Sequence, residues 1–300
     1  MLNPISEVHE HTLAGSAICA GVGVHTGAHV RLSIRPAPSG AGIVFVRTDI
    51  KDRDNRVAAR ADMVVAARLG TVIANAAGVT VSTIEHLMAA MAMLGVDNAT
   101  VELDGPEVPI MDGSALPFVQ LLDRSGFRRQ EAPQRYIEVL ETVSVVEGDK
   151  RASLSPCDHF EVAFEIEFPS AVIGKMRIDL EVTEDSFRRE LAAARTFGFI
   201  EEVEALRAAG LARGGSLENV IVIDGDRVLN PEGLRFEDEF VRHKALDAIG
   251  DLYTLGAPLL ARFEGVKAGH ALNNALVRAL LARPEAWRVV TFNRQMAQAG

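Results

Sequence analysis

The chain has 300 residues, 48% of them hydrophobic, and a net charge of −10 at pH 7. It is long enough to bury the cores of two modest domains, whereas its negative charge argues against a broad nucleic-acid surface, which needs clustered cations. Two cysteines are too few for a disulfide scaffold, the N-terminus lacks the basic flank of a signal peptide, and no apolar run approaches the roughly 20 residues of a membrane span, so a cytoplasmic location is expected.

The first half is predicted to begin with strands and to continue with helices. Short apolar pieces broken by Gly and Pro at 13–47 indicate strands joined by tight turns. A helix is predicted over STIEHLMAAMAMLG, with Ser82 as N-cap and Gly95 as C-cap. The strand ATVELDG and a second helix in SALPFVQLLDRSG follow.

A polar, proline-containing segment at 128–136 predicts the boundary between an N-terminal domain, 1–132, and a C-terminal domain, 133–300. The second half again begins with strands, and its last two helices are FVRHKALDAIGDLY and a helix that begins near Gly269. Since both halves place strands before helices, the order predicts an α+β protein with two α+β layers of similar plan.

The helix FVRHKALDAIGDLY gathers four charged or titratable side chains on one side. At about 100° per residue, His243, Lys244, Asp247 and Asp251 fall in one stripe. His243 and Asp247 are one turn apart, so the two side chains can share a metal ion. A solvated polar stripe is the more frequent cause of such spacing, and a catalytic zinc site needs about three protein ligands with one position left for water.

Two other histidines are candidates for the same chemistry. His86 follows Glu85, and a carboxylate beside a metal-bound water is suited to act as a general base. The spacing of Ser82 and Glu85 fits a helix capping box equally well. His270 is predicted at a helix N-terminus, where the dipole disfavours a charged imidazole, so as an acid it needs a nearby anion such as Asp251. A capping or surface histidine is the alternative.

Three further segments give weaker signals. In ARTFGF, Thr196 offers a hydroxyl that can donate to an oxyanion. The paired glycines of GGSLEN permit a close approach of the backbone to a ligand. Both segments are more often ordinary turns, and the two Asp-Gly pairs of DGPEVPIMDGSALPF are expected to brace a loop.

Six motifs occur in an order that is found in one family. They are STIEHLMAA, DGPEVPIMDGSALPFV, ARTFGF, GGSLENVIV, LRFEDEFVRHKALDAIGDL and KAGHALNN. On these motifs, and over about residues 9–292, the chain resembles the zinc-dependent UDP-3-O-acyl-N-acetylglucosamine deacetylases, the family that catalyses the committed step of lipid A synthesis in Gram-negative bacteria.

The resemblance implies a role for each matching residue. One catalytic Zn²⁺ is expected, with the ligands His86, His243 and Asp247. Glu85 is implied as general base and His270 as general acid. Thr196 is implied as an oxyanion donor, and Asp251 as the support of the acid. The implied substrate-binding residues are Lys244, Lys267, Phe197, Gly215 and Ser216.

The resemblance also implies the reaction and the architecture. The reaction is hydrolysis of the N-acetyl group of UDP-3-O-acyl-N-acetylglucosamine to UDP-3-O-acyl-glucosamine and acetate. The implied fold packs the helices of two α+β sandwiches together, with the active site at the domain interface. The expected partner is this small-molecule substrate, without nucleic acid or an integral membrane segment, and the expected state is a monomer.

Two other functions remain open at this level. The polar stripe suits a hydrogen-bond network in a non-catalytic module that binds a sugar nucleotide or a lipid, and such a module would hold no stoichiometric zinc. The same metal ligands also suit a metal-dependent amidohydrolase that acts on a different acyl amide, such as a peptide.

Overall fold

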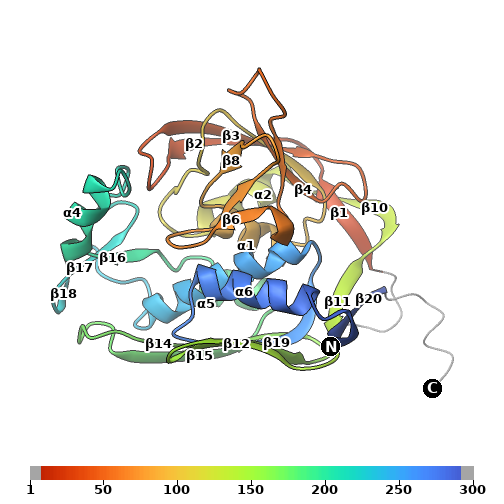
Figure 1. Ribbon diagram of the computed structural model, residues 1–300. Coiled ribbons are helices and arrows are strands. Elements are labelled where there is room, and N and C mark those ends of the chain that lie inside the picture. Colours follow the sequence, from red (N-terminus) through yellow and green to blue (C-terminus); the bar gives the residue numbers. More distant parts are fainter. Residues whose placement is uncertain (1–7, 292–300) are drawn as a thin grey trace.

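The computed structural model describes residues 8–291, and its main helices lie in the middle of the molecule between two large sheets (Figure 1). The sheets are built from separate parts of the chain, because one uses strands between Ala17 and Leu103 and the other uses strands between Arg135 and Thr291. The predicted α+β class is confirmed. None of the helices within residues 8–291 is both long and apolar enough to cross a membrane.

The N-terminal sheet has five strands in the order β2-β3-β9-β4-β5. They are β2 (Ala17–Val22), β3 (His29–Pro36), β4 (Ile43–Arg47), β5 (Arg56–Ala58) and β9 (Ala99–Leu103). β4 runs parallel to β9, and the other neighbours are antiparallel. Along β3, Val30, Leu32 and Ile34 are buried and alternate with more exposed residues, as expected for a strand with one face on a core.

Helix α1 (Glu85–Met93) has the sequence EHLMAAMAM, which consists mostly of strong helix formers. Gly95, predicted as the C-cap, lies one residue beyond it: Leu94 is the C-cap residue, and Gly95, with φ 65°, follows. The predicted N-cap is wrong: Ile84 occupies that position without a side-chain cap, and the Ser82 amide donates to the Pro106 carbonyl instead. Helix α2 (Leu116–Ser125) follows β9 as expected.

The C-terminal sheet has seven strands, of which β19 is central. They are β11 (Arg135–Val139), β12 (Val143–Glu147), β13 (Lys150–Pro156), β14 (Phe160–Glu167), β15 (Lys175–Glu181), β19 (Leu259–Val266) and β20 (Trp287–Thr291). Two long helices cover the inner face of this sheet, α5 (Glu239–Leu252) and α6 (His270–Leu281). β15, β19 and β20 were not predicted from the sequence.

The smaller elements lie around these layers. They are β1 (His9–Leu13) with β10 (Phe127–Pro133), the sheet of β6 (Val64–Ala66), β7 (Val72–Ala74) and β8 (Thr80–Val81), and the sheet of β16 (Phe197–Phe199), β17 (Ile221–Asp224) and β18 (Arg227–Val228) with α4 (Ile200–Ala208). In the segment EDSFRRELAAA, α3 (Glu184–Ser186) is followed by a π-helical turn over Phe187–Leu191.

The polar segment at 128–136 is not an irregular linker. β10 occupies most of it and pairs antiparallel with β1, and β11 begins directly afterwards. The domain division at 132/133 therefore stays a prediction, although no strand of either large sheet crosses it.

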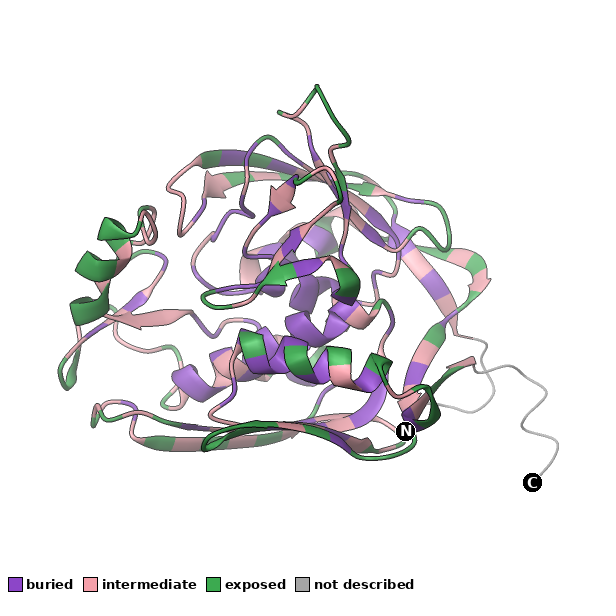
Figure 2. Cartoon of the chain, in the orientation of Figure 1, coloured by how far each residue is buried: buried purple, intermediate pink, exposed green. Residues whose placement is uncertain are grey.

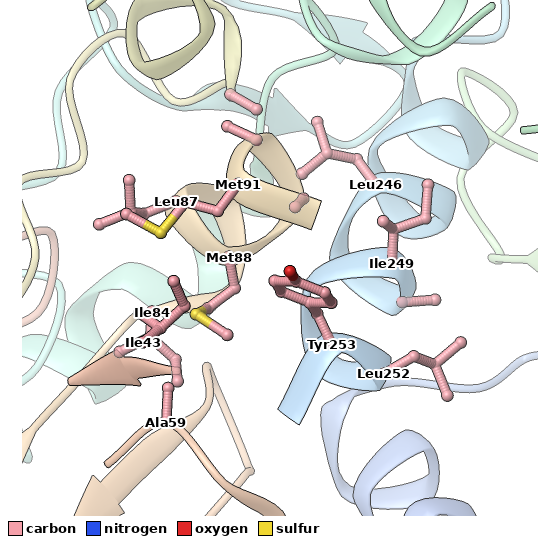
Figure 3. Packing of buried hydrophobic residues seen from close by; sticks show 14 of the residues in the cluster. Ile43, Ala59, Ile84, Leu87, Met88, Met91, Leu246, Ile249, Leu252 and Tyr253 are labelled. Carbon is pink, nitrogen blue, oxygen red and sulfur yellow. The ribbon is translucent and has the colours of Figure 1, made fainter. Parts of the chain in front are cut away.

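Helices α1 and α5 pack directly against each other at the centre of the molecule, where most buried residues lie (Figures 2 and 3). Met88, Leu246 and Ile249 fill the contact region with exposed fractions of 0–2%. Gly250 brings the two backbones together, because a Cβ at this position would lie 2.0 Å from the main-chain oxygen of Glu85. Only glycine permits this approach, which brings the first turn of α1 next to α5.

Candidate metal centre

Three potential metal ligands meet where α1 crosses α5. His86 lies in the first turn of α1, and His243 and Asp247 lie one turn apart on α5. All three are buried, and their ligand atoms lie within 4.8 Å of one another. The Nε2 atoms of His86 and His243 are 3.4 and 3.3 Å from Asp247 Oδ1. The grouping of these residues that the sequence suggested is therefore present.

The donor atoms fit a cation between them. The Nδ1 of His243 lies 3.0 Å from the main-chain oxygen of Ala194, so Nδ1 carries the hydrogen and Nε2 directs a lone pair at Asp247 Oδ1. That oxygen is buried and accepts no hydrogen bond from the described residues. Ligand atoms at tetrahedral zinc bonds of about 2.0–2.1 Å lie about 3.4 Å apart, which matches both distances. Facing lone pairs at this spacing are compatible with a bound metal ion.

The charges of these ligands suit the same role. Burial lowers the pKa of His243 to about 3, which keeps the imidazole neutral and available as a ligand. Burial alone would raise the pKa of Asp247, but His243 and the Lys244 ammonium outweigh it and hold the pKa well below its usual range. Asp247 is therefore a carboxylate, with Oδ2 bonded to Lys244 Nζ at 2.7 Å and Oδ1 free to face the histidines.

Glu85 lies beside this group, at the start of α1. Its Oε2 accepts a hydrogen bond of 2.9 Å from the main-chain amide of Thr71, while Oε1 lies 3.9 Å from His270 Nε2. The capping-box alternative is therefore wrong, because the carboxylate bonds the Thr71 amide and not that of Ser82. Burial raises the pKa of Glu85, which makes the carboxylate a stronger base.

His270 begins α6 and is paired with the anion that the sequence suggested. Its Nδ1 lies 2.9 Å from Asp251 Oδ2, and its Nε2 lies 3.6 Å from Asp247 Oδ2. Burial alone would lower the pKa of His270, but Asp251 and Asp247 outweigh it and raise the pKa to about 9. The imidazole is therefore charged at neutral pH and can donate a proton from Nε2.

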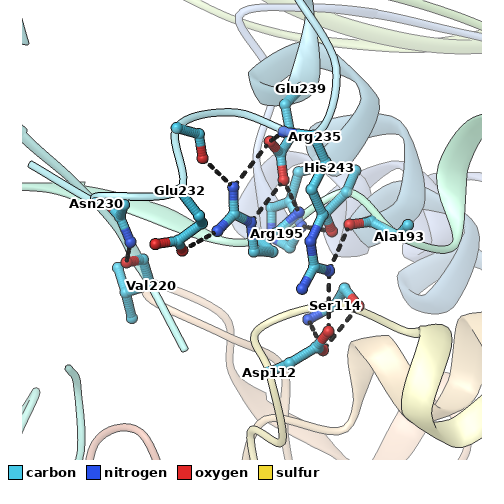
Figure 4. A network of polar contacts seen from close by, with 12 residues as sticks. Asp112, Ser114, Ala193, Arg195, Val220, Asn230, Glu232, Arg235, Glu239 and His243 are labelled. Atoms are coloured by element: carbon cyan, nitrogen blue, oxygen red, sulfur yellow. Dashed lines mark hydrogen bonds and ion pairs between the residues drawn. The ribbon is translucent and has the colours of Figure 1, made fainter. Parts of the chain in front are cut away.

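The segment ARTFGF is held against α5 by a buried network of polar contacts (Figure 4). The guanidinium of Arg195 donates to Glu239 Oε1 at 2.9 Å and to Glu232 Oε1 at 2.7 Å. This anchoring brings Ala194 to His243, and Thr196 follows two residues later with its amide bonded to the Gly113 carbonyl. A buried Arg–Glu pair with several hydrogen bonds fixes the segment because each charge would be costly to leave unpaired.

Phe197 lies beside the metal-ligand group. Its ring centroid is 6.4 Å from that of His243 and 5.0 Å from that of Phe240, and the ring is only partly buried. The aromatic position of ARTFGF therefore forms an apolar wall next to the polar site.

The two lysines singled out in the sequence are both engaged in ion pairs. Lys244 is the Asp247 partner described above. Lys267 lies further away in the turn after β19 and pairs with Asp149 Oδ2 at 2.9 Å and Glu167 Oε2 at 2.6 Å. These pairs leave Lys244 beside the candidate centre and Lys267 among surface carboxylates.

The glycines of GGSLEN contact the chain itself. A Cβ on Gly214 would lie 2.3 Å from the main-chain oxygen of Gly23, whereas one on Gly215 would meet no atom closer than 3.7 Å. The Ser216 amide donates to the side chain of Asn219, which closes a turn. The close backbone approach expected at these glycines is therefore to Gly23.

Side chains of the loop DGPEVPIMDGSALPF hold neighbouring segments in place. Glu107 is fully buried and accepts hydrogen bonds from the amides of His25 and Thr26 and from the hydroxyls of Thr26 and Thr83. Asp112 pairs with Arg235 at 2.9 Å. Thr83, with φ 58°, lies just before α1, so Glu107 fixes the strained backbone that leads into the helix.

Sequence reasoning missed three buried residues that contact the acid and base. Thr71 donates its hydroxyl to Asp251 Oδ1, Asn273 donates to Asp251 Oδ2, and Asn274 donates to Thr71 Oγ1. The two asparagines lie three and four residues after His270, on the same side of α6, so helical spacing was a usable signal for them. Thr71 lies in a short loop without periodicity and gave no such signal.

The fold and site define an α+β protein with a buried His, His, Asp group that is compatible with a metal ion, next to a charged imidazole and a carboxylate. The family model of the UDP-3-O-acyl N-acetylglycosamine deacetylases matches residues 10–282, and the chain belongs to this family. The matched region includes the N-terminal sheet, the C-terminal sheet except β20, and the helices between the two sheets (Figure 1).

Curated relatives that carry the name UDP-3-O-acyl-N-acetylglucosamine deacetylase are similar over most of their length. The protein from Phenylobacterium zucineum is 68% identical over 290 residues, which is 97% of this chain and 99% of the relative. The one from Myxococcus xanthus is 51% identical, over 97% of this chain and 92% of the relative. The one from Shewanella oneidensis is 48% identical, over 96% and 94%.

Proposed function

We propose that the chain is a zinc-dependent hydrolase that removes the N-acetyl group of UDP-3-O-acyl-N-acetylglucosamine, in the committed step of lipid A biosynthesis. The main observation behind this proposal is that His86, His243 and Asp247, from two helices, lie close together. The Glu85 carboxylate and the charged imidazole of His270 lie beside them. The family and the names of its curated members support the choice of substrate.

The proposed ligands of one zinc ion are His86 Nε2, His243 Nε2 and Asp247 Oδ1. Bound there, zinc supplies a Lewis acid that makes water a stronger acid and polarises a carbonyl group. Three ligands of this type are what a catalytic site needs if a fourth position is left open. The Ala194 carbonyl orients His243, and Lys244 orients Asp247 through Oδ2.

Glu85 is the proposed general base. Its Oε2 is held by the Thr71 amide, so Oε1 is the oxygen that takes the proton from the attacking water. Burial raises the pKa of the carboxyl group, which favours uptake of that proton. The water oxygen then forms a bond to the acetamide carbonyl carbon, and the hydroxyl of Thr196 donates to the resulting oxyanion.

His270 is the proposed general acid. Its Nε2–H gives a proton to the departing amine nitrogen as the carbon–nitrogen bond breaks, and acetate remains. Asp251 keeps the imidazole charged and fixes the ring through Nδ1, which leaves Nε2 as the donor.

The proposed substrate contacts surround this group. Phe197 offers an apolar surface to the sugar, and Lys244 and Lys267 offer positive charge to the diphosphate, in competition with the carboxylates that they pair with here. Gly215 and Ser216 are proposed to contact the substrate through the turn they form.

The remaining proposals concern the whole chain. We place it in the cytoplasm as a monomer of two domains, 1–132 and 133–300. The two cysteines, which are free, are compatible with a reducing compartment, and the separate strand sets of the two large sheets support the division.

The decisive experiment combines zinc quantification with a deacetylation assay. The purified protein is expected to contain about one zinc per chain and to release acetate from the acylated UDP-sugar, to lose activity on chelation, and to regain it when zinc is restored. Absence of stoichiometric metal would favour a non-catalytic binding module. Release of acetate from a peptide panel, with none from the UDP-sugar, would favour a different amidohydrolase.

A further inference from the structure

Thr71 is a fully buried loop residue that contacts both Glu85, the proposed base, and Asp251, the partner of the proposed acid His270. Its main-chain amide donates to Glu85 Oε2 at 2.9 Å, and its hydroxyl donates to Asp251 Oδ1 at 2.5 Å. We infer that Thr71 is a positioning residue that fixes the orientation of Glu85 and of the Asp251–His270 pair; this inference rests on the proposed function.

The hydroxyl of Thr71 has one direction available for its hydrogen. Asn274 Nδ2 donates to Thr71 Oγ1 at 3.2 Å, so the oxygen already acts as an acceptor. The hydrogen therefore points to Asp251 Oδ1. A hydroxyl held from both sides in this way is a fixed donor and not a rotating one.

The carboxylate of Asp251 depends on that donor. Its Oδ2 receives hydrogen bonds from His270 Nδ1 and Asn273 Nδ2, both at 2.9 Å, whereas Thr71 is the donor to Oδ1 among residues 8–291. Without the hydroxyl, a buried carboxylate oxygen would be left unpaired, which is costly. The carboxylate would then turn to share the remaining donors, and the hydrogen bond that orients His270 would weaken.

The main-chain amide of Thr71 has the complementary effect on the base. It holds Glu85 Oε2, so that Oε1 is directed to the side of His270 Nε2. Only proline would remove the amide, and it would also restrict the backbone, whereas the hydroxyl, which is one of the contacts that hold the residue in place, can be removed with little change in shape. One loop residue therefore sets the spacing between the group that takes the proton and the group that gives it.

Thr254 provides a matched control. Like Thr71, it is buried, with an exposed fraction of 1%, and its hydroxyl donates to Asp251 at 2.6 Å. The acceptor, however, is the main-chain oxygen of Asp251. Threonine to valine at either position removes a buried hydroxyl with little change in shape, but only Thr71→Val leaves Asp251 Oδ1 without a donor.

The test compares Thr71→Val, Thr71→Ser and Thr254→Val in the full-length, zinc-loaded protein, with the acylated UDP-sugar as substrate. For Thr71→Val, kcat is expected to fall about 10–100-fold, with KM and zinc content close to wild type, because removal of such supporting partners has effects of this size. Thr71→Ser keeps the hydroxyl and is expected to restore most of kcat, and Thr254→Val is expected to stay within about twofold of wild type.

A second measurement does not depend on the reaction. In histidine-labelled, substrate-free protein, the Nδ1–H resonance of His270, assigned by its loss in His270→Gln, is expected to shift and to exchange faster in Thr71→Val. It is expected to be unchanged in Thr254→Val. If Thr71→Val does not fold, Thr71→Ala takes its place in both experiments.

The outcomes separate this inference from the proposed function. A wild-type protein without deacetylase activity would refute the function, and the His270 resonance alone would then decide the role of Thr71. Equal kcat losses in Thr71→Val and Thr254→Val, or an unchanged His270 resonance in Thr71→Val, would overturn the positioning role.

Discussion

His270 and Asp251 form a buried hydrogen bond in which the imidazole Nδ1 lies 2.9 Å from the carboxylate Oδ2. The bond comes from two different helices, since Asp251 lies in the last turn of α5 and His270 is the first residue of α6. It leaves Nε2 as the nitrogen that faces Glu85 and Asp247. The candidate acid and base therefore face each other across one small space next to the metal-ligand group.

Replacement of His270 by glutamine is expected to reduce kcat by about 10²–10⁴-fold, the usual size of a general-acid contribution. Zinc content should stay near that of wild type, because His270 is outside the group of three ligands. The measurements are steady-state kinetics and metal content of the same sample. A His270→Gln protein that had lost its zinc, and recovered full activity with added metal, would show that His270 serves the metal and not the proton transfer.

Replacement of Asp247 by alanine is expected to empty the metal site before any other property changes. The variant removes the only carboxylate of the ligand group and leaves two histidines as the remaining ligands. Asp251→Asn, one turn further along α5, is the control and is expected to keep its zinc. Metal content is measured after dialysis, with circular dichroism to confirm folding. Full occupancy in Asp247→Ala would remove this residue from the ligand set.

Gly250→Ala is expected to lower the free energy of unfolding by at least about 2 kcal/mol, in the range of overpacked core substitutions. The added Cβ would lie 2.0 Å from the Glu85 main-chain oxygen, so α1 and α5 must separate. Gly198→Ala is the control, because a Cβ there meets no atom within 4 Å. Urea unfolding measures both variants. If Gly250→Ala and Gly198→Ala had equal free energies of unfolding, α1 and α5 would be able to separate without loss of stability.

Asp97 gives a prediction for pH. Its carboxylate accepts hydrogen bonds from the His11 amide and from Gln134, both at 2.7 Å, but burial raises its pKa from 3.8 to about 6. The folded state therefore binds more protons than the unfolded state between these values, and the stability that Asp97 contributes falls as the pH rises through 6. Relative to Asp97→Asn, the wild type should lose about 1.4 kcal/mol between pH 5 and pH 7.5.

The measurement is the free energy of unfolding of wild type and Asp97→Asn at the two pH values. Taking the difference between the two proteins removes the contributions of other titrating groups. A difference that is independent of pH would contradict a raised pKa for Asp97.

Much of the site was predictable because helical spacing is a local property. His243 and Asp247 had to lie on one side of any helix that contained them, and Asp251 lies one turn further on. The pairing of Asp251 with His270 was also predictable, because a charged imidazole at a helix N-terminus needs a nearby anion. No local pattern joins α1 to α5. The prediction that His86, in the N-terminal half, lies beside His243 and Asp247 therefore rested on the family resemblance.

The parts that sequence reasoning missed depend on contacts between distant segments. Thr71 meets Asp251 across 180 positions in the chain, and its loop has neither a periodic pattern nor a recognisable turn signal. β15 is different, because KMRIDLE alternates polar and apolar residues with the period of a half-buried strand, so a usable local signal for it was present and was overlooked. The polar segment that contains β10 was taken for a boundary because an edge strand with charged side chains has the composition of a linker.

The crossing of α1 and α5 at Gly250 has a consequence for how the protein is made. His86 is synthesised early, but His243 and Asp247 emerge from the ribosome only with α5, after most strands of the C-terminal sheet have been translated. A nascent chain that stops before α5 contains only His86 of the three candidate ligands. Capture of an ion at this crossing therefore belongs to the last stage of folding, and chains truncated before this point are expected to be inert.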